Sequence, residues 1–147
     1  MDACPLPKSV PEDEDAIIRR MLKGRRIAVV GLSHDASRAS NFVAKYLQST
    51  GYEIIPVNPA YEEVIGLRCY PNLQSIPGKI DIVDVFRRPE FCAAVARNAV
   101  EVGAGGIWLQ SGIASAEARR IAEEAGIDYI ENRCLKVEHM MHRHRGT

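Results

Sequence analysis

IAVVGLSHDASRASN, the sequence of residues 27–41, joins a short apolar run to a glycine and a polar loop. The apolar run predicts a buried β-strand over 27–30, and Gly31 permits the tight turn that ends it. The amphipathic residues at 40–49 then predict a helix. Its inward face is expected to hold Phe42, Val43, Tyr46 and Leu47. A strand, a polar loop and a helix in this order form the opening unit of an α/β fold.

The rest of the chain repeats this alternation of apolar and amphipathic segments. Further strands are predicted at 53–57, 68–70, 80–86, 106–109 and 127–130, and further helices at 12–23, 90–102, 116–125 and 133–142. Ser115 is a predicted helix N-cap, and Gly126 is predicted to end the same helix. Apolar strands separated by helices are typical of a parallel sheet covered on both faces. The sequence therefore predicts an α/β fold with a doubly wound, Rossmann-type parallel sheet in a single domain.

Composition limits the classes of function. The chain has 147 residues, and its 19 Lys and Arg residues balance 19 Asp and Glu residues. A formal net charge of zero argues against a general nucleic-acid or membrane-surface binder. No apolar run reaches the length of a membrane span. The patterns divide the chain into an N-terminal arm and helix at 1–23, the Rossmann-type domain at 24–138, and a basic, histidine-rich tail at 139–147.

The cysteines and the N-terminus bear on the compartment. Cys4, Cys69, Cys92 and Cys134 form no C-x-x-C pair and match no zinc spacing. Residues 1–15 lack the apolar core of a secretory signal. These features predict reduced thiols and a cytoplasmic location. We identify no catalytic triad, paired carboxylates or metal cluster, so no catalytic or metal-binding residue is predicted.

The loop after the first strand is the candidate ligand site. Gly31, Ser33 and Ala36 have the spacing of the dinucleotide fingerprint G-x-G-x-x-G/A, with serine in place of the second glycine. Ser33, Arg38 and Ser40 supply hydrogen-bond donors near a helix N-terminus, where phosphate groups bind. Taken alone, this pattern fits a phosphate loop and an ordinary polar turn equally well.

The residues at the end of the second predicted strand bear on which nucleotide ligand could bind. NAD-binding domains carry Asp or Glu there to hold the ribose, whereas this chain has Val57, Asn58 and Pro59. The missing carboxylate argues against NAD, and less strongly against NADP. Arg87 and Arg88 follow the strand that ends at Phe86 and are candidates for the same crevice. The alternative of a solvated surface arginine is favoured for Arg88.

Five ordered blocks of sequence carry a resemblance to a known family. They are IAVVGLS at 27–33, GYEIIPVNP at 51–59, DIVDVFR at 81–87, IWLQSG at 107–112 and NRCLK at 132–136. Over roughly residues 24–138 the chain resembles the small CoA-binding proteins related to the N-terminal domain of the succinyl-CoA synthetase α subunit. Asn132 is a mild departure, because the family more often has aspartate there.

The resemblance implies a Rossmann-type domain that binds coenzyme A. It implies that Gly31, Ser33, Arg38 and Ser40 surround the pyrophosphate, that Val57, Asn58 and Pro59 border the adenosine end, and that Phe86 and Arg87 lie beside the cleft. The larger synthetases add a domain with a phosphorylated histidine, for which this chain has no room. His34 is therefore interpreted as a loop residue, and His139, His142 and His144 as part of a solvated tail.

The sequence leaves several roles open. The favoured function is a stand-alone binding or regulatory module for CoA or acyl-CoA that is not an enzyme by itself. The alternatives are a subunit of an acyl-CoA synthetase-like enzyme, which needs a partner for catalysis, and an NAD(P)-binding protein. A protein partner or a homo-oligomer is possible on either reading. Trp108 is expected in the core, Cys134 is expected to be structural rather than reactive, and Gln110–Gly112 fits a pantetheine contact or a polar turn equally well.

Overall fold

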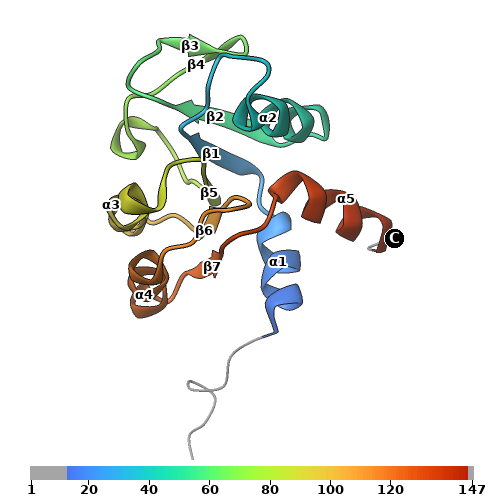
Figure 1. Ribbon diagram of the computed structural model, residues 1–147, viewed down its shortest axis with the longest axis vertical. Coiled ribbons are helices and arrows are strands. Elements are labelled where there is room, and N and C mark those ends of the chain that lie inside the picture. The colour runs from blue at the N-terminus through green and yellow to red at the C-terminus, as the bar shows by residue number, and fades with distance from the viewer. Residues whose placement is uncertain (1–12, 146–147) are drawn as a thin grey trace, which may run out of the picture.

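A five-stranded parallel sheet forms the centre of the computed structural model, which describes residues 13–145 (Figure 1). The strands are β1 (Arg26–Val30), β2 (Glu53–Val57), β5 (Ile82–Val85), β6 (Gly106–Leu109) and β7 (Asp128–Ile130). Their order in the sheet is β2-β1-β5-β6-β7, and every neighbouring pair is parallel. The predicted single-domain, doubly wound Rossmann-type fold is confirmed.

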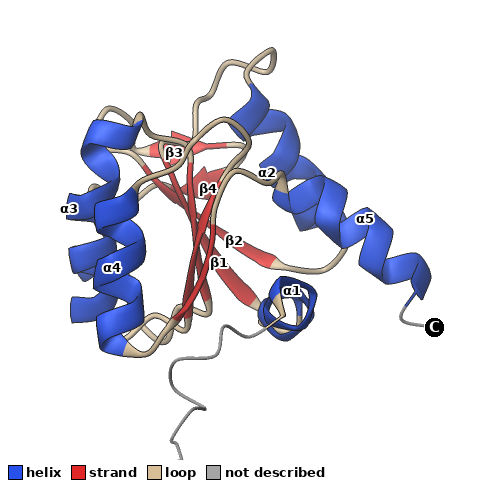
Figure 2. Cartoon of the chain, turned by 60° about the horizontal axis from the view of Figure 1, so that its bottom comes forward, coloured by secondary structure: helices blue, strands red, loops and turns tan. Residues whose placement is uncertain are grey.

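Helices cover both faces of this sheet (Figure 2). One face carries α3 (Pro89–Glu101) and α4 (Ala116–Ala125), and the other carries α1 (Glu14–Leu22), α2 (Ala39–Ser49) and α5 (Leu135–Arg145). Between β2 and β5 lie a two-stranded antiparallel ribbon, β3 (Glu63–Val64) with β4 (Leu67–Arg68), and the short 3-10 helix η2 (Leu73–Ser75).

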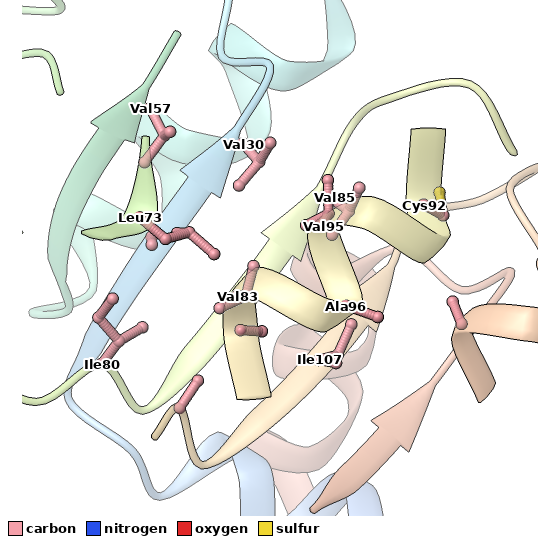
Figure 3. Packing of buried hydrophobic residues seen from close by; sticks show 14 of the residues in the cluster. Val30, Val57, Leu73, Ile80, Val83, Val85, Cys92, Val95, Ala96 and Ile107 are labelled. Atoms are coloured by element: carbon pink, nitrogen blue, oxygen red, sulfur yellow. The ribbon is translucent and has the colours of Figure 1, made fainter. Parts of the chain in front are cut away.

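Alternate residues of each strand supply two separate cores, as the twofold period of a strand requires. Val83, Val85 and Ile107 face α3 and α4 (Figure 3). Ile82 and Trp108 face the other helical layer. Trp108 is fully buried, and its Nε1 donates a 2.8 Å hydrogen bond to the Arg133 carbonyl oxygen, which confirms its predicted place in the core.

One charged residue interrupts the second core. Asp84 occupies the middle of β5, in register with Val29 on one side and Trp108 on the other, and it is fully buried. Neither carboxyl oxygen has a hydrogen-bond partner among the described residues. Burial alone raises the pKa of Asp84 well above its ordinary value, because a low dielectric disfavours the charged form.

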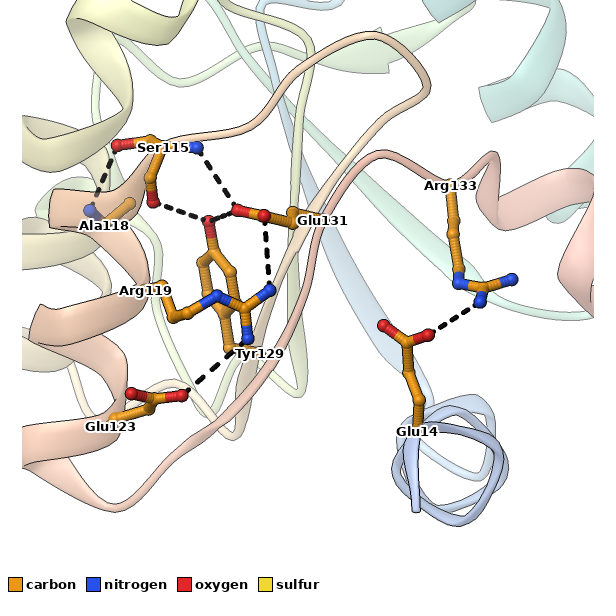
Figure 4. A network of polar contacts seen from close by, with 8 residues as sticks. All are labelled: Glu14, Ser115, Ala118, Arg119, Glu123, Tyr129, Glu131 and Arg133. Carbon is orange, nitrogen blue, oxygen red and sulfur yellow. Dashed lines mark hydrogen bonds and ion pairs between the residues drawn. The ribbon is translucent and has the colours of Figure 1, made fainter. Parts of the chain in front are cut away.

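Polar contacts fix the start of α4 and the end of β7 (Figure 4). Ser115 caps α4 as predicted, because its Oγ accepts a 3.0 Å bond from the Ala118 amide. The Tyr129 hydroxyl donates to Glu131 Oε1 at 2.8 Å, and an Arg119 guanidinium nitrogen lies 3.2 Å from Glu131 Oε2. Gly126 ends the helix in the left-handed conformation, also as predicted.

The predicted strand at 68–70 is wrong as a member of the main sheet. Leu67 and Arg68 pair antiparallel within the small ribbon, and Tyr70 alone makes an isolated parallel bridge to Val57. Tyr70 makes both backbone bonds to β2, and the chain after β2 then turns at Asn58, whose carbonyl oxygen accepts from the Tyr61 amide and whose Oδ1 accepts from the Ala60 amide, so the ladder ends there. The outer edge of β2 is therefore covered by one residue rather than by a full strand.

The expected inward position of Phe42 is also wrong. Its side chain is 55% exposed, and the Lys136 ammonium lies 4.6 Å from the centre of its ring. The inward stripe of α2 instead passes through Ser40, Val43, Ala44 and Leu47, which follow the three- and four-residue spacing of a helix face.

The C-terminal histidines do not form a solvated tail as a group. Helix α5 runs to Arg145, and His142 is only 7% exposed, with its Nε2 3.3 Å from an Asp15 oxygen of α1. His139 Nδ1 lies 2.8 Å from the Tyr46 hydroxyl. The amphipathic pattern of α5 is too weak to predict from the sequence that these histidines pack against α1 and α2. The predicted N-terminal arm at 1–11, Cys4 and the last two residues lie outside the described part of the chain.

Helix α1 is joined to the C-terminal elements by ion pairs. Arg20 makes two bonds to the Asp128 carboxylate of β7, at 2.6 and 2.9 Å. Glu14 lies 2.6 Å from the Arg133 guanidinium (Figure 4). These contacts hold the first helix against the last strand and the segment that leads into α5.

Candidate functional site

The topology of the sheet places a crevice between β1 and β5. Helix α2 follows β1 on one face, and α3 follows β5 on the other, so the connections diverge at the carboxyl ends of these neighbouring strands. Ligands of open α/β sheets bind at such a switch point. Gly31 follows β1 here, and Phe86 and Arg87 follow β5.

Gly31 is required by both conformation and space. Its φ is +88°, and its amide donates a 2.9 Å bond to the Val57 carbonyl oxygen. A Cβ atom built on it would lie 2.7 Å from the Phe86 carbonyl oxygen and 3.3 Å from Arg87 Cδ. The backbones after β1 and β5 therefore approach closely only because residue 31 has no side chain.

Gly31→Ala is expected to lower the free energy of unfolding by about 2–4 kcal/mol, since a left-handed alanine is strained and its Cβ meets backbone. Urea denaturation measures the loss. Gly66→Ala is the matched control, because Gly66 has φ +74° and a Cβ atom added to it would meet no atom within 4 Å. The difference between the two variants isolates the clash with Phe86, and equal losses would contradict it.

Two hollows meet at Gly31. The first, here called the α3 hollow, has a volume of about 320 Å³ and is walled mainly by apolar residues and amides, with one arginine. The second, the α2 hollow, has a volume of about 490 Å³, and two arginines and two serines are among its walls. The α3 hollow is lined by Val30, Gly31, Val57, Asn58, Pro59, Pro71, Asn72, Leu73, Arg87, Val95 and Asn98. The α2 hollow is lined by Gly31, Ser33, Arg38, Ala39, Ser40, Phe86 and Arg88.

Internal hydrogen bonds hold the loop between β1 and α2. The Ser33 amide donates to Ser40 Oγ at 3.0 Å, and Asn41 Nδ2 donates to the Ser33 carbonyl oxygen at 2.8 Å. Ser40 is thus a positioning residue whose hydroxyl proton is still available to a ligand. Asp35 Oδ1 accepts from the Ser37 amide and hydroxyl, and these bonds lower the pKa of Asp35.

Positive charge gathers around the α2 hollow. Arg38 is the N-cap of α2 and Arg88 is the N-cap of α3, and both side chains line this hollow. The first-turn N–H groups of a helix lack intrahelical partners, and the helix dipole places partial positive charge there. Arg88 is 74% exposed, as favoured from the sequence, yet it also borders the hollow. The N-termini of two helices and two arginines therefore favour an anion in the α2 hollow.

Arg87 lines the α3 hollow instead. Its guanidinium carbon lies 4.3 Å from the centre of the Phe91 ring, which orients the side chain along α3. Arg87 therefore borders the α3 hollow beside Val95 and Asn98. The structure gathers every residue of the sequence-predicted site around one hollow or the other. Sequence reasoning missed Pro71–Leu73, Val95 and Asn98 as walls, since only the turn at Pro71–Asn72 gave a signal.

Three other candidates have structural partners. Gln110 is buried, and its Oε1 accepts a 3.1 Å bond from the Leu135 amide at the start of α5. The His34 and Tyr61 rings lie 4.2 Å apart and join the loops that follow β1 and β2. Cys134 is half-buried beside the second core. These contacts favour the structural interpretation of Gln110 and Cys134.

Two other kinds of site are absent from the described residues. Residues 13–145 contain no group of three or more His, Cys, Asp or Glu side chains placed to hold a metal ion. In the same part of the chain, no helix is both long enough and apolar enough to cross a bilayer.

The parallel sheet and its switch-point hollows define an α/β domain of the Rossmann type. The chain belongs to the CoA-binding domain family, whose family model matches residues 25–140. It is 44% identical over 117 residues to the uncharacterized protein YneT of Bacillus subtilis, covering 80% of this chain and 87% of that one. A solved hypothetical protein from Pyrococcus horikoshii OT3 superposes with a TM-score of 0.83 at 36% identity, covering 96% of this chain and 98% of the other.

A longer relative shows the same domain in another setting. The chain is 27% identical over 130 residues to the ADP-forming acetate–CoA ligase I of Archaeoglobus fulgidus. The match covers 80% of this chain but only 19% of the ligase. The relation to acyl-CoA synthetase-like proteins expected from the sequence is therefore confirmed, at the level of one domain.

Proposed function

We propose that this protein binds coenzyme A or an acyl-CoA across the two hollows. The pyrophosphate lies in the α2 hollow, against the loop from Gly31 to Ser40, and the adenosine end lies in the α3 hollow. One observation carries the proposal: the α2 hollow, with two arginines and two serines in its walls, and the more apolar α3 hollow meet at Gly31, between the N-termini of α2 and α3. Membership of the CoA-binding domain family supports the choice of ligand.

The α2 hollow suits a pyrophosphate. Each helix N-terminus contributes roughly half a positive charge. Arg38 adds a full charge, and Arg88, whose Nε lies 3.8 Å from a Glu90 carboxylate oxygen, adds a charge that this carboxylate partly offsets. The chain as a whole is formally neutral, so this positive charge is a local feature of the crevice. The hydroxyl protons of Ser33 and Ser40 supply short donors at the floor, where Gly31 lets the backbone approach a phosphate.

The α3 hollow suits an adenosine. Val57, Leu73 and Val95 offer apolar surface for a base, and Asn98 offers an amide for directional hydrogen bonds. Arg87, held against Phe91, supplies the charge that a phosphorylated ribose requires. Coenzyme A carries such a phosphate, whereas NAD does not.

Asn58 does not substitute for the acid of NAD-binding domains. Its Nδ2 donates to the Leu32 carbonyl oxygen at 3.2 Å, and its Oδ1 accepts from the Ala60 amide at 2.9 Å. Both ends of the amide are engaged in holding the two loops, and no carboxylate of residues 13–145 lines the α3 hollow. A ribose diol would find no anionic acceptor among these walls.

CoA is therefore expected to bind more tightly than NAD, by about tenfold or more, since a charge-assisted hydrogen bond is worth about 1.5–3 kcal/mol. Calorimetric titration of CoA, acetyl-CoA, NAD, NADP and ATP into the full chain at one salt concentration measures the order. NAD binding equal to or tighter than CoA binding would refute the proposal. NADP binding at the level of CoA would instead support the NADP alternative.

The role that fits this site best is a stand-alone binding or regulatory module. The alternative, a subunit that needs a partner for catalysis, has one structural observation in its favour. The exposed large apolar side chains of the described chain are Phe42, Val137, Met140 and Met141, and all lie on α2 or α5. Phe42 lies in the first turn of α2, and the N-terminus of this helix borders the α2 hollow, so a partner bound to this surface would lie near that hollow.

A further inference from the structure

A second cleft lies at the opposite end of β1 and β2 from the proposed CoA site. Two adjoining hollows of about 380 and 240 Å³ share Leu22, Lys23, Tyr52 and His139. They occupy the space between α1, α5 and the turn from α2 to β2, here called the α1–α5 cleft. Helix α1 lies outside the residues matched by the family model, 25–140, so this cleft is partly built from sequence beyond the shared domain.

The α1–α5 cleft is rich in cations. Lys23 borders both hollows, Arg25 borders the larger and Arg143 the smaller. No ion pair with a described residue neutralises any of these three side chains, and no carboxylate lines either hollow within residues 13–145. In a chain with a formal net charge of zero, three cations that have no ion-pair partner among residues 13–145 around one concave surface favour an anion.

The helix ends at this cleft do not cancel that charge. The carboxyl ends of α1 and α2 both point here, and each carries roughly half a negative charge. Together they offset about one of the three cations. The pKa of His139 is lowered, by burial first and by the positive charge of Arg143 second, so this ring also lies in a positive environment.

Three residues shared by the two hollows, Leu22, Tyr52 and His139, supply an apolar and aromatic floor. The Tyr52 hydroxyl donates a 2.6 Å bond to the Leu22 carbonyl oxygen, and the Tyr46 hydroxyl lies 2.8 Å from His139 Nδ1. The Tyr52 and His139 rings meet edge to face with centres 5.6 Å apart. Both rings are fixed before any ligand binds, which lowers the entropic cost of binding.

We propose that the α1–α5 cleft binds a mononucleotide-sized anion. A flat ring packs on Leu22, Tyr52 and His139, and the phosphate groups lie toward Lys23, Arg25 and Arg143. The volume of each hollow is close to the lower limit for small-molecule sites, which matches a ligand smaller than CoA. This site is independent of the proposed CoA site, because the two lie at opposite ends of the same strands.

Calorimetric titration of AMP, ADP and pyrophosphate into the full chain tests the proposal. Lys23→Glu and Arg143→Glu are each expected to weaken AMP and ADP by about tenfold, from the reversal of a charge near phosphate. Lys45→Glu, on the exposed surface of α2, is the matched control and should change nothing. AMP should bind more tightly than pyrophosphate, because only AMP uses the aromatic floor.

Proton NMR of the His139 ring gives a second readout. Bound AMP should raise the pKa of His139, because a nearby negative charge favours the imidazolium form. Binding of none of the three probes, equal losses in Lys23→Glu and Lys45→Glu, or a loss in Arg38→Ala with none in Lys23→Glu would overturn the proposal. Lys23→Glu should leave CoA binding unchanged, so failure of this site and failure of the CoA site are separate results.

Discussion

The double variant Arg38→Ala/Arg88→Ala is expected to bind CoA at least about a hundredfold more weakly than the parent chain. In the proposed complex each guanidinium makes a charge-assisted contact worth about 1.5–3 kcal/mol, and tenfold in affinity corresponds to about 1.4 kcal/mol. Arg38→Ala alone should cost about tenfold to a hundredfold. Both side chains are exposed at helix N-caps, so the fold should persist. Calorimetry on variants matched by circular dichroism measures the effect.

One control changes a residue of the same loop, and the other makes the same kind of substitution on a distant helix. Asp35→Asn removes a negative charge from the loop but keeps the oxygen that accepts from the Ser37 amide, so CoA should bind equally or slightly more tightly. Asp35→Ala is unsuitable, because it would also release the loop. Arg120→Ala, on the exposed surface of α4, should have no effect. Parent-like affinity in the double variant would exclude pyrophosphate from the α2 hollow.

Asp84→Val is expected to stabilise the protein by about 1–3 kcal/mol, the usual cost of leaving a buried polar group unpaired. Valine fits a central strand between Val29 and Trp108 and removes a carboxyl group whose oxygens have no partner among the described residues. At this chain length such a gain should raise the melting temperature by several degrees. Urea and thermal denaturation measure it.

The gain should depend on pH. The folded-state pKa of Asp84 is raised above its unfolded value of about 3.8, so the folded state binds its proton more tightly. The parent therefore keeps full stability from this group below pH 4 and loses it as the pH rises toward the folded-state pKa, at about 1.4 kcal/mol per pH unit. The advantage of Asp84→Val should widen over that interval.

Asp84→Asn separates the two causes. It removes the titration but leaves a buried polar group, so the stability difference from Asp84→Val should be the same at every pH. A parent whose stability relative to Asp84→Val does not change between pH 5 and pH 8 would contradict the assignment of a raised pKa. An Asp84→Val variant less stable than the parent at both values would show that the carboxyl group has an unrecognised partner.

Local signals predicted the fold well. The strand at 53–57 and the helix that ends at Ala125 agree with the structure residue for residue, because apolar β-branched runs, Ser115 and Gly126 act through their own neighbourhood. The predicted strand at 68–70 failed for a reason outside its own sequence preference. Its pairing depends on the chain that follows β2, which turns away at Asn58.

The site was predicted only in part, for a similar reason. Gly31, Ser33 and Arg38 lie on one loop and were found from one motif. Leu73, Val95 and Asn98 come from separate elements, and only the packing of η2 and α3 against the sheet brings them to the α3 hollow. The sequence did not predict the burial of Asp84 either, since a carboxylate in a strand pattern normally indicates the solvent-facing side.

The ion pairs of α1 set an order for biosynthesis. Arg20 and Asp128 are 108 residues apart, and Glu14 and Arg133 are 119 apart. During translation α1 leaves the ribosome before the whole sheet, whereas its partners in β7 and the segment after it emerge more than 100 residues later. A nine-residue helix is marginal in water without packing. Helix α1 therefore cannot form these ion pairs until β7 and the segment that leads into α5 have been synthesised.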